Sequence, residues 1–233
     1  MTRDINAVKV CAFDMFGTLF DVHSVVQACR DAFGPEGNEF SVVWRRIQLE
    51  YSWMRALMER WVPFWQVTCD SLDTTLEVYG RGDDGGLRDR LLGAYKKVSP
   101  YPDSGPALEA LGEAGVRCVI LTNGSRDMVN SALDAAGFKD RFEGVFTVDD
   151  IEIFKPSPRV YAMARDGLKL EPEEILMVSS HPWDLAGAIS YGFQGVWIDR
   201  PGTGHHLEHL GFDPDHRVHT LTGLVKLVSG SAS

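Results

Sequence analysis

The stretch Val8-Lys-Val-Cys-Ala-Phe-Asp-Met-Phe-Gly-Thr-Leu-Phe20 decides the fold of this chain. Its apolar, β-branched first half predicts a buried parallel strand, and Asp14 follows at the carboxyl end of that strand. Ligands of open α/β sheets bind in the crevice outside such strand ends, so Asp14 is a candidate nucleophile. The alternative is an aspartate that only caps a turn.

The pattern Asp14-x-x-x-Thr18 resembles the first motif of the haloacid dehalogenase superfamily, whose members attack their substrates with this aspartate. Phosphatases of that superfamily usually carry a second aspartate two positions later, as the proton donor. This chain has Phe16 there, and an aromatic ring without a hydroxyl cannot transfer a proton. The hydrolytic dehalogenases carry an aromatic residue at this position, and the phrase Phe-Gly-Thr-Leu-Phe-Asp-Val-His-Ser is similar to theirs.

The composition fits a folded protein with one core, or with a core and an insertion: 233 residues, of which 44% are hydrophobic. A net charge of -10 argues against a nucleic-acid partner, because phosphate backbones are bound by clustered Lys and Arg. No segment approaches the roughly 18 apolar residues of a membrane span, and we expect no signal segment at the amino terminus. We therefore expect no membrane partner and a cytoplasmic location. The four cysteines lack Cys-x-x-Cys spacing and are expected to be reduced, without a disulfide or zinc site.

The periodicity predicts two kinds of region. Apolar residues at intervals of three and four predict a purely helical region with helices over 22–33, 41–60, 68–79 and 87–98. From Pro100 onward, strands alternate with helices, which is typical of a parallel α/β sheet. We expect strands over 117–121, 144–147, 175–179 and 194–198, and helices over 104–114, 126–136, 158–168, 185–192 and 221–228. The predicted architecture is a Rossmann-like core of residues 1–20 and 98–233, with an inserted helical cap of residues 21–97.

Polar residues follow several of these strands, and the topology brings them to one crevice. Thr122 and Asn123 match the second motif of the superfamily, where a helix amino terminus can also receive a substrate anion. Lys155 is expected to keep Asp14 ionised, because a nearby opposite charge lowers the pKa of an acid. The alternatives are a solvated lysine before a proline, and hydroxyl groups that only cap the next helix.

The segment Ser179-Ser-His-Pro-Trp-Asp184 occupies the place of the fourth motif. Magnesium-dependent members offer two aspartates there, since Mg²⁺ prefers hard oxygen ligands. One carboxylate remains in this chain, so we expect no metal and no other cofactor, and phosphoryl transfer loses its main support. The segment resembles the dehalogenase pattern, although that family usually has Asn in place of His181.

The segment Val43-Trp-Arg-Arg-Ile-Gln-Leu-Glu-Tyr-Ser-Trp53 resembles the cap helix of the L-2-haloacid dehalogenases, whose first arginine accepts the leaving halide. This implies a halide role for Arg45. The alternative is that Arg45 and Arg46 form a solvated face paired with Glu50. The family often has Gln in place of Arg46. Phe64 matches an aromatic residue of the halide pocket, with a core phenylalanine as the alternative.

The resemblance implies a role for thirteen side chains. The catalytic ones are Asp14, Thr18, Arg45, Lys155, Ser179 and Asp184. The substrate-binding ones are Phe16, Leu49, Phe64, Thr122, Asn123, His181 and Trp183.

The resulting hypothesis is hydrolytic dehalogenation of short 2-haloalkanoic acids to 2-hydroxy acids through an ester on Asp14. The substrates include haloacetates, with fluoroacetate as a candidate because of His181. The alternatives are a small-molecule phosphatase of the same superfamily and a non-catalytic binding protein that kept the fold. The expected partners are the haloacid, the halide and a second copy of the chain. The homodimer is expected from large apolar side chains on the cap helix: Trp44, Tyr51, Trp53, Met54, Leu57 and Met58.

Overall fold

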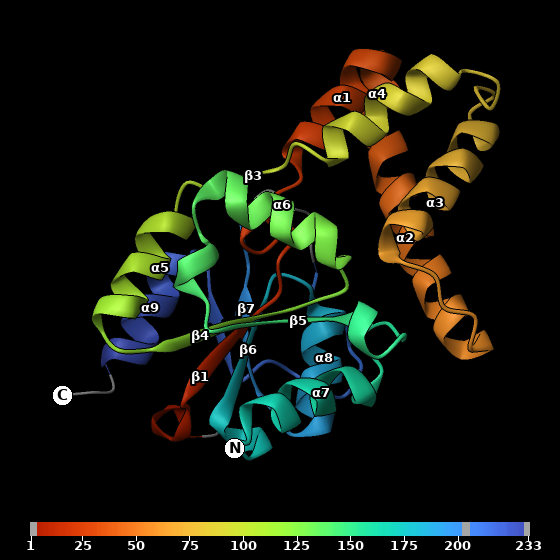
Figure 1. Cartoon of the computed structure of the whole chain (residues 1–233). Coiled ribbons are helices and arrows are strands. Elements are labelled where there is room, and N and C mark those ends of the chain that lie inside the picture. The colour runs from red at the N-terminus through yellow and green to blue at the C-terminus, as the bar shows by residue number, and fades with distance from the viewer. Residues whose placement is uncertain (1–3, 202–205, 231–233) are drawn as a thin grey trace.

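The computed structural model describes residues 4–201 and 206–230. Within them, a six-stranded parallel sheet forms the centre of the molecule (Figure 1). The strands, in spatial order, are β5 (Gly144–Thr147), β4 (Arg117–Thr122), β1 (Val10–Phe13), β6 (Ile175–Ser179), β7 (Gln194–Ile198) and β8 (His216–Val218). Strand β1 lies between β4 and β6, and all four of its residues are buried. A strand covered on both faces must be apolar throughout, which explains the continuous apolar run before Asp14.

Helices cover both faces of the sheet and form two apolar clusters with it. On one face pack α5 (Ser104–Glu113), α6 (Arg126–Ala136) and α9 (Leu221–Ser229). On the other face pack α7 (Pro158–Leu168) and α8 (Pro182–Tyr191). The carboxyl ends of the strands therefore remain as the open edge where polar side chains collect.

A helical unit is inserted between two short strands, β2 (Phe20–Asp21) and β3 (Ser99–Pro100), which pair antiparallel. Its helices are α1 (His23–Phe33), α2 (Gly37–Met58), α3 (Phe64–Val78) and α4 (Gly85–Tyr95). They share an apolar cluster of their own and stand to one side of the sheet in Figure 1. This cluster buries Trp44, which the sequence interpretation counted among the surplus apolar side chains of α2; that assignment was wrong, since the indole lies between α2 and α3.

Several predicted boundaries differ from the structure where a helix start is set by a proline. Helix α3 begins at Phe64 rather than at residue 68, with Pro63 as its N-cap, and α8 begins at Pro182 rather than at residue 185. Proline fits these positions because the first helical N–H groups need no intrahelical acceptor. Strand β8 was missed because its three residues are half-buried or exposed, without an apolar pattern.

Five short 3-10 helices complete the described elements: Ile5–Ala7, Gly34–Glu36, Lys139–Arg141, Val148–Asp150 and Pro172–Glu174. Among the helices of the described residues, none has the length and apolar character needed to cross a membrane.

Candidate active site

Asp14 lies directly after β1, and its side chain is almost fully buried. Lys155 Nζ lies 3.3 Å from Oδ1 of its carboxylate, and Thr18 Oγ1 donates to Oδ2 over 3.2 Å. The structure thus brings together three residues that the sequence placed on this edge. An ammonium group and a hydroxyl donor both favour the ionised carboxylate, which is the form able to act as a nucleophile.

Lys155 also forms an ion pair with Asp184, over 2.8 Å between Nζ and Oδ2, so one ammonium group serves two buried carboxylates. The Tyr161 hydroxyl donates to Asp184 Oδ1 and to the Asp184 carbonyl, both over 3.0 Å. Burial raises the pKa of Asp184, and the charge of Asp14 acts in the same direction, whereas Lys155 and the Tyr161 hydrogen bond lower it. The sequence interpretation missed Tyr161, because a tyrosine inside a helix gives no sign that its hydroxyl reaches a strand end.

The loop after β1 is tied to the loop after β6 through Ser180. The backbone N–H of Ser180 donates to Thr18 Oγ1 over 2.9 Å, and Ser180 Oγ donates to the Gly17 carbonyl over 2.9 Å. Gly17 has a φ of +92°, and a Cβ there would lie 2.9 Å from His181 Nε2. Both the backbone conformation and the space beside His181 therefore favour glycine. Ser179, the predicted catalytic serine, accepts the His181 N–H with its Oγ over 3.1 Å. The neighbouring Ser180, absent from the predicted site, makes the contacts to Thr18.

Thr122 and Asn123 hold loops around the site. Asn123 Oδ1 accepts the backbone N–H of Lys155 over 2.9 Å, which fixes the start of the segment that carries the ammonium group. Thr122 Oγ1 accepts the N–H of Gly124 over 3.0 Å, and the N–H of Arg126 donates to Asp149. Two N–H groups near the start of α6 therefore already have protein acceptors. Fewer backbone N–H groups remain there to bind a substrate carboxylate.

His181 lies between the loop after β1 and the helical unit. Its Nε2 is 3.0 Å from the Phe16 carbonyl, 3.5 Å from Arg45 Nη2 and 3.9 Å from Asp14 Oδ2. A carbonyl oxygen only accepts hydrogen bonds, so Nε2 carries the proton. Trp183 stacks on the imidazole, with ring centroids 5.9 Å apart and planes 22° apart.

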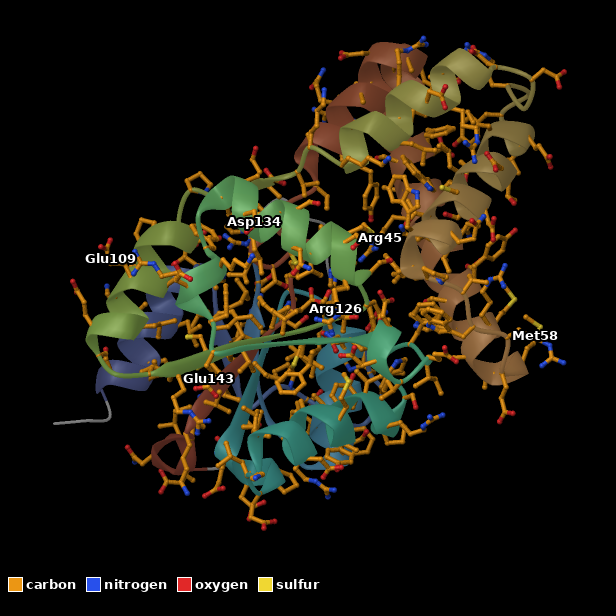
Figure 2. The ribbon with its side chains drawn as sticks, in the orientation of Figure 1. Arg45, Met58, Glu109, Arg126, Asp134 and Glu143 are labelled. Atoms are coloured by element: carbon orange, nitrogen blue, oxygen red, sulfur yellow. The ribbon has the colours of Figure 1, made fainter. Side chains whose placement is uncertain are left out.

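The two adjacent arginines of α2 have different environments. Arg45 is half-buried and reaches from α2 toward the core, as Figure 2 shows, whereas Arg46 is exposed and lies within ion-pair distance of Glu50, 3.8 Å from Nε to Oε1. The solvated-face interpretation therefore holds for Arg46 and is wrong for Arg45. Leu49 follows Arg45 by one helical turn and is half-buried. Phe64 is buried and packs on Phe154, with ring centroids 6.0 Å apart.

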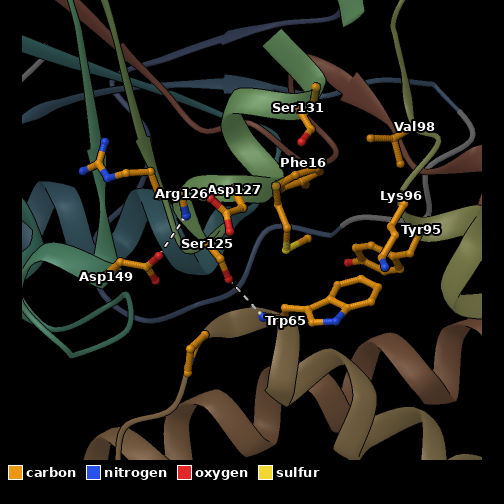
Figure 3. A pocket seen from close by; sticks show the side chains of 13 residues that line it. Phe16, Trp65, Tyr95, Lys96, Val98, Ser125, Arg126, Asp127, Ser131 and Asp149 are labelled. Atoms are coloured by element: carbon orange, nitrogen blue, oxygen red, sulfur yellow. Dashed lines mark hydrogen bonds between the residues drawn. The ribbon is translucent and has the colours of Figure 1, made fainter. Parts of the chain in front are cut away.

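A cavity of about 620 Å³ lies between the helical unit and the start of α6 (Figure 3). Phe16 forms part of its wall, and across it the backbone N–H of Trp65 donates to Ser125 Oγ over 3.1 Å. Lys96 lies over the Trp65 ring, 4.7 Å from the ring centroid. The cavity therefore adjoins the loop after β1, where the helical unit meets the sheet.

Within the described residues, no group of three or more His, Cys, Asp and Glu side chains is arranged to hold a metal ion. The carboxylates of Asp14 and Asp184 instead share the ammonium group of Lys155.

The pH dependence of turnover is expected to report on Asp184. Its ionised form holds Lys155, and burial raises its pKa, so activity should fall on the acid side at a higher pH than for an ordinary carboxyl group. Tyr161→Phe removes a hydrogen bond that lowers this pKa, so the acid limb of the kcat profile should move to still higher pH. Tyr191→Phe, on the neighbouring ring, is the control. An unshifted limb in Tyr161→Phe would show that Asp184 does not control it.

Comparison with known proteins gives a consistent result. Residues 8–192 match the family model of haloacid dehalogenase-like hydrolases. The chain is 41% identical to the (S)-2-haloacid dehalogenase 4A of Burkholderia cepacia, over 97% of this chain and 96% of that protein. It is 37% identical to the haloacetate dehalogenase H-2 of Moraxella sp. (strain B), over 97% of this chain and the whole of that protein.

A solved structure is similar over the same length. The L-2-haloacid dehalogenase of Xanthobacter autotrophicus with chloropropionic acid covalently bound superposes with a TM-score of 0.86 at 36% identity, covering 96% of this chain and 99% of that one.

Proposed function

Since the chain belongs to the haloacid dehalogenase-like hydrolases, and within them to the (S)-2-haloacid dehalogenases, we propose that it hydrolyses short 2-haloalkanoic acids to 2-hydroxy acids. One observation carries the proposal: the buried carboxylate of Asp14 faces Lys155 and Thr18, while Arg45 of the helical unit reaches the same place beside His181. A nucleophile and a cation for the leaving anion thus meet at one point.

The reaction proceeds in two steps. A carboxylate oxygen of Asp14 attacks the carbon that bears the halogen, the carbon–halogen bond breaks, and the halide leaves with the bonding electrons. Water then attacks the carboxyl carbon of the ester, which releases the 2-hydroxy acid, restores the carboxylate and frees one proton. Lys155 and Thr18 keep the nucleophile ionised, and Ser179 and Asp184 act with Lys155 to position the water. The covalently bound chloropropionic acid of the Xanthobacter enzyme supports an ester route.

Substrate binding follows from the surrounding side chains. Thr122 and Asn123 hold the substrate carboxylate, so that the carbon is presented in line with Asp14. Phe16, Leu49 and Trp183 enclose the alkyl part. Arg45 and Phe64 receive the halide.

The direct test is a parallel assay of halide release from chloroacetate and (S)-2-chloropropionate and of phosphate release from small phosphoesters, each with and without a chelator. We expect halide release that the chelator leaves unchanged. Chelator-sensitive phosphate release without halide release would favour the phosphatase alternative. An absence of turnover on all substrates would favour a binding protein that kept the fold.

Fluoroacetate is proposed as a further substrate because of His181. Arg45 Nη2 and His181 Nε2 are both donors and lie 3.5 Å apart. A halide near both would accept a hydrogen bond from Arg45 Nη2, and would share the hydrogen of His181 Nε2 with the Phe16 carbonyl. Fluoride is the strongest acceptor among the halides and the poorest leaving group, so it depends most on such donors.

His181→Asn should therefore lower fluoride release by about tenfold more than chloride release, the size of one charge-assisted hydrogen bond. The measurement is kcat for fluoroacetate, chloroacetate and bromoacetate in both proteins. An equal effect on all three halides would mean that the imidazole only packs beneath the cap.

We also propose that residues 21–97 act as a cap over the site.

The outer end of α2 is proposed to form a homodimer contact. Met54, Leu57 and Met58 are 44%, 86% and 58% exposed, and Figure 2 shows Met58 pointing away from the core. Sedimentation at micromolar concentration should give twice the mass of the chain, and Leu57→Glu should give single chains, because a charge is costly in an apolar contact. Val42→Glu, at the other end of α2, is the matched control. Single chains in the unmodified protein would rule out the dimer.

A further inference from the structure

Gln48 is a fully buried amide inside the helical unit, 1% exposed, on α2 one turn after Arg45. Its Oε1 accepts a hydrogen bond from Arg45 Nη1 over 2.5 Å. Residues three apart on a helix lie on the same face, so this contact follows from the local sequence once the face is buried. Buried amides are costly unless their polar atoms have partners, which makes the other contacts of Gln48 informative.

The remaining contacts of the amide come from two other helices. Gln48 Nε2 donates to Thr68 Oγ1 of α3 over 2.7 Å and lies 3.2 Å from the Tyr95 hydroxyl of α4, which also lies 3.3 Å from Gln48 Oε1 and can donate to it. Thr68 gives its own hydroxyl hydrogen to the Phe64 carbonyl over 2.9 Å, so toward Gln48 it accepts. A guanidinium group only donates, so the oxygen of the amide must face Arg45. The side-chain oxygen of Gln48 therefore faces Arg45, and its nitrogen faces Thr68.

The two terminal nitrogens of Arg45 have different surroundings. Nη1 bonds to Gln48 inside the cap, and Nη2 lies 3.5 Å from His181 Nε2 in the core. The partner that fixes the guanidinium is neutral, although a glutamate of the same length would form a stronger contact. A neutral partner leaves the full positive charge of Arg45 available to an anion, whereas a carboxylate would cancel much of it.

We propose that Gln48 is a positioning residue for Arg45, which aims the guanidinium at the leaving halide without compensating its charge. This inference rests on the proposed function, in which Arg45 receives the halide. Its consequence is a requirement at position 48 for a side chain that is long enough to reach Arg45, accepts a hydrogen bond and is uncharged.

Two variants separate these requirements. Gln48→Glu keeps the acceptor and adds a negative charge, and Gln48→Met keeps the length and removes the acceptor. Both should weaken inhibition by added chloride and bromide about tenfold or more, the effect of one charge-assisted hydrogen bond, and should lower kcat for chloroacetate. Gln66→Met, an exposed glutamine on α3, is the matched control and should leave both quantities unchanged.

The readout is the inhibition constant of sodium chloride and sodium bromide at constant ionic strength, together with kcat, KM and thermal unfolding. A role in cap stability alone would lower the unfolding temperature and leave the halide constants unchanged, which would overturn the inference. If a Gln48 variant does not fold, Tyr95→Phe gives the same readout, because it keeps the ring and removes a hydroxyl partner of the Gln48 amide.

Arg45→Met distinguishes this inference from the function on which it rests. If Gln48 acts through Arg45, Gln48→Met should have no further effect on the halide constants or on kcat in the Arg45→Met background. A further loss in that background would overturn the positioning role. If Arg45→Met itself leaves turnover and halide inhibition unchanged, the halide role of Arg45 fails instead.

Discussion

Asp14→Asn is expected to reduce kcat for halide release at least about 10⁴-fold, because an uncharged amide is a poor nucleophile and cannot form the ester. The replacement keeps the size of the side chain and leaves an oxygen that can still face Thr18 or Lys155. Halide release measured under saturating chloroacetate checks the expectation. Asp134→Asn, at an exposed aspartate of α6, is the control. Retention of more than a few per cent of kcat by a folded Asp14→Asn protein would exclude Asp14 as the nucleophile.

The ester route has an independent signature in the path of the water oxygen. A single turnover in heavy-oxygen water, with the enzyme in excess, should place the label in the carboxylate of Asp14 and not in the first product molecule. This follows because water attacks the carboxyl carbon of the ester, and the product takes its oxygen from the aspartate. Mass analysis of the peptide that contains Asp14 measures the label. Label found only in the 2-hydroxy acid would indicate direct attack of water on the substrate.

Lys155→Met is expected to have the second largest effect. The ammonium group, 1% exposed, lies between Asp14 and Asp184, so its removal leaves two buried carboxylates without their shared cation. The pKa of Asp184 should rise, because Lys155 is one of the groups that lower it. We expect kcat to fall about 10³-fold, and the free energy of unfolding at pH 7 to fall by about 3 to 5 kcal/mol, the usual cost of breaking a buried ion pair.

The loss of stability in Lys155→Met should depend on pH if it comes from the missing charge. In Lys155→Met, acidification protonates a buried carboxylate and removes the uncompensated charge, so the stability gap to the unmodified protein should narrow as the pH falls. Denaturant unfolding at pH 5 and pH 8 measures the gap. Lys226→Met, at an exposed lysine of α9, should show no gap at either pH. A gap of constant size would mean that Lys155 contributes through packing and not through its charge.

Much of the fold followed from local patterns. The ranges predicted for α6, α7, β5, β6 and β7 coincide with the observed ones, because each is an apolar run or a periodic segment closed by glycine, proline or a polar turn. The errors at α3 and α8 arose where a proline sets the start of the helix, as the N-cap Pro63 of α3 and as the first residue, Pro182, of α8. Strand β8 depends on pairing with β7, which no local pattern reveals.

For the site, the order of the residues argued against phosphatase chemistry, and the resemblance to the dehalogenase family supplied the hydrolytic reaction. Asp14 after an apolar strand, Phe16 in place of a proton donor, and a fourth motif with one carboxylate are visible in the order of residues. They are local facts, readable because a strand end and its loop are contiguous in the chain.

The tertiary structure alone decided which of two adjacent arginines faces the core. Arg45 and Arg46 have the same charge and the same local surroundings, and they differ by about 100° around α2. The packing of α2 against α3 and α4 buries Gln48 and with it the Arg45 face, and leaves Arg46 beside Glu50. The contacts of Tyr161 with Asp184 and of Ser180 with Thr18 likewise exist only after distant segments pack together. The physical reason is that side-chain direction depends on which face of an element is buried, and burial is set by partners far away in the chain.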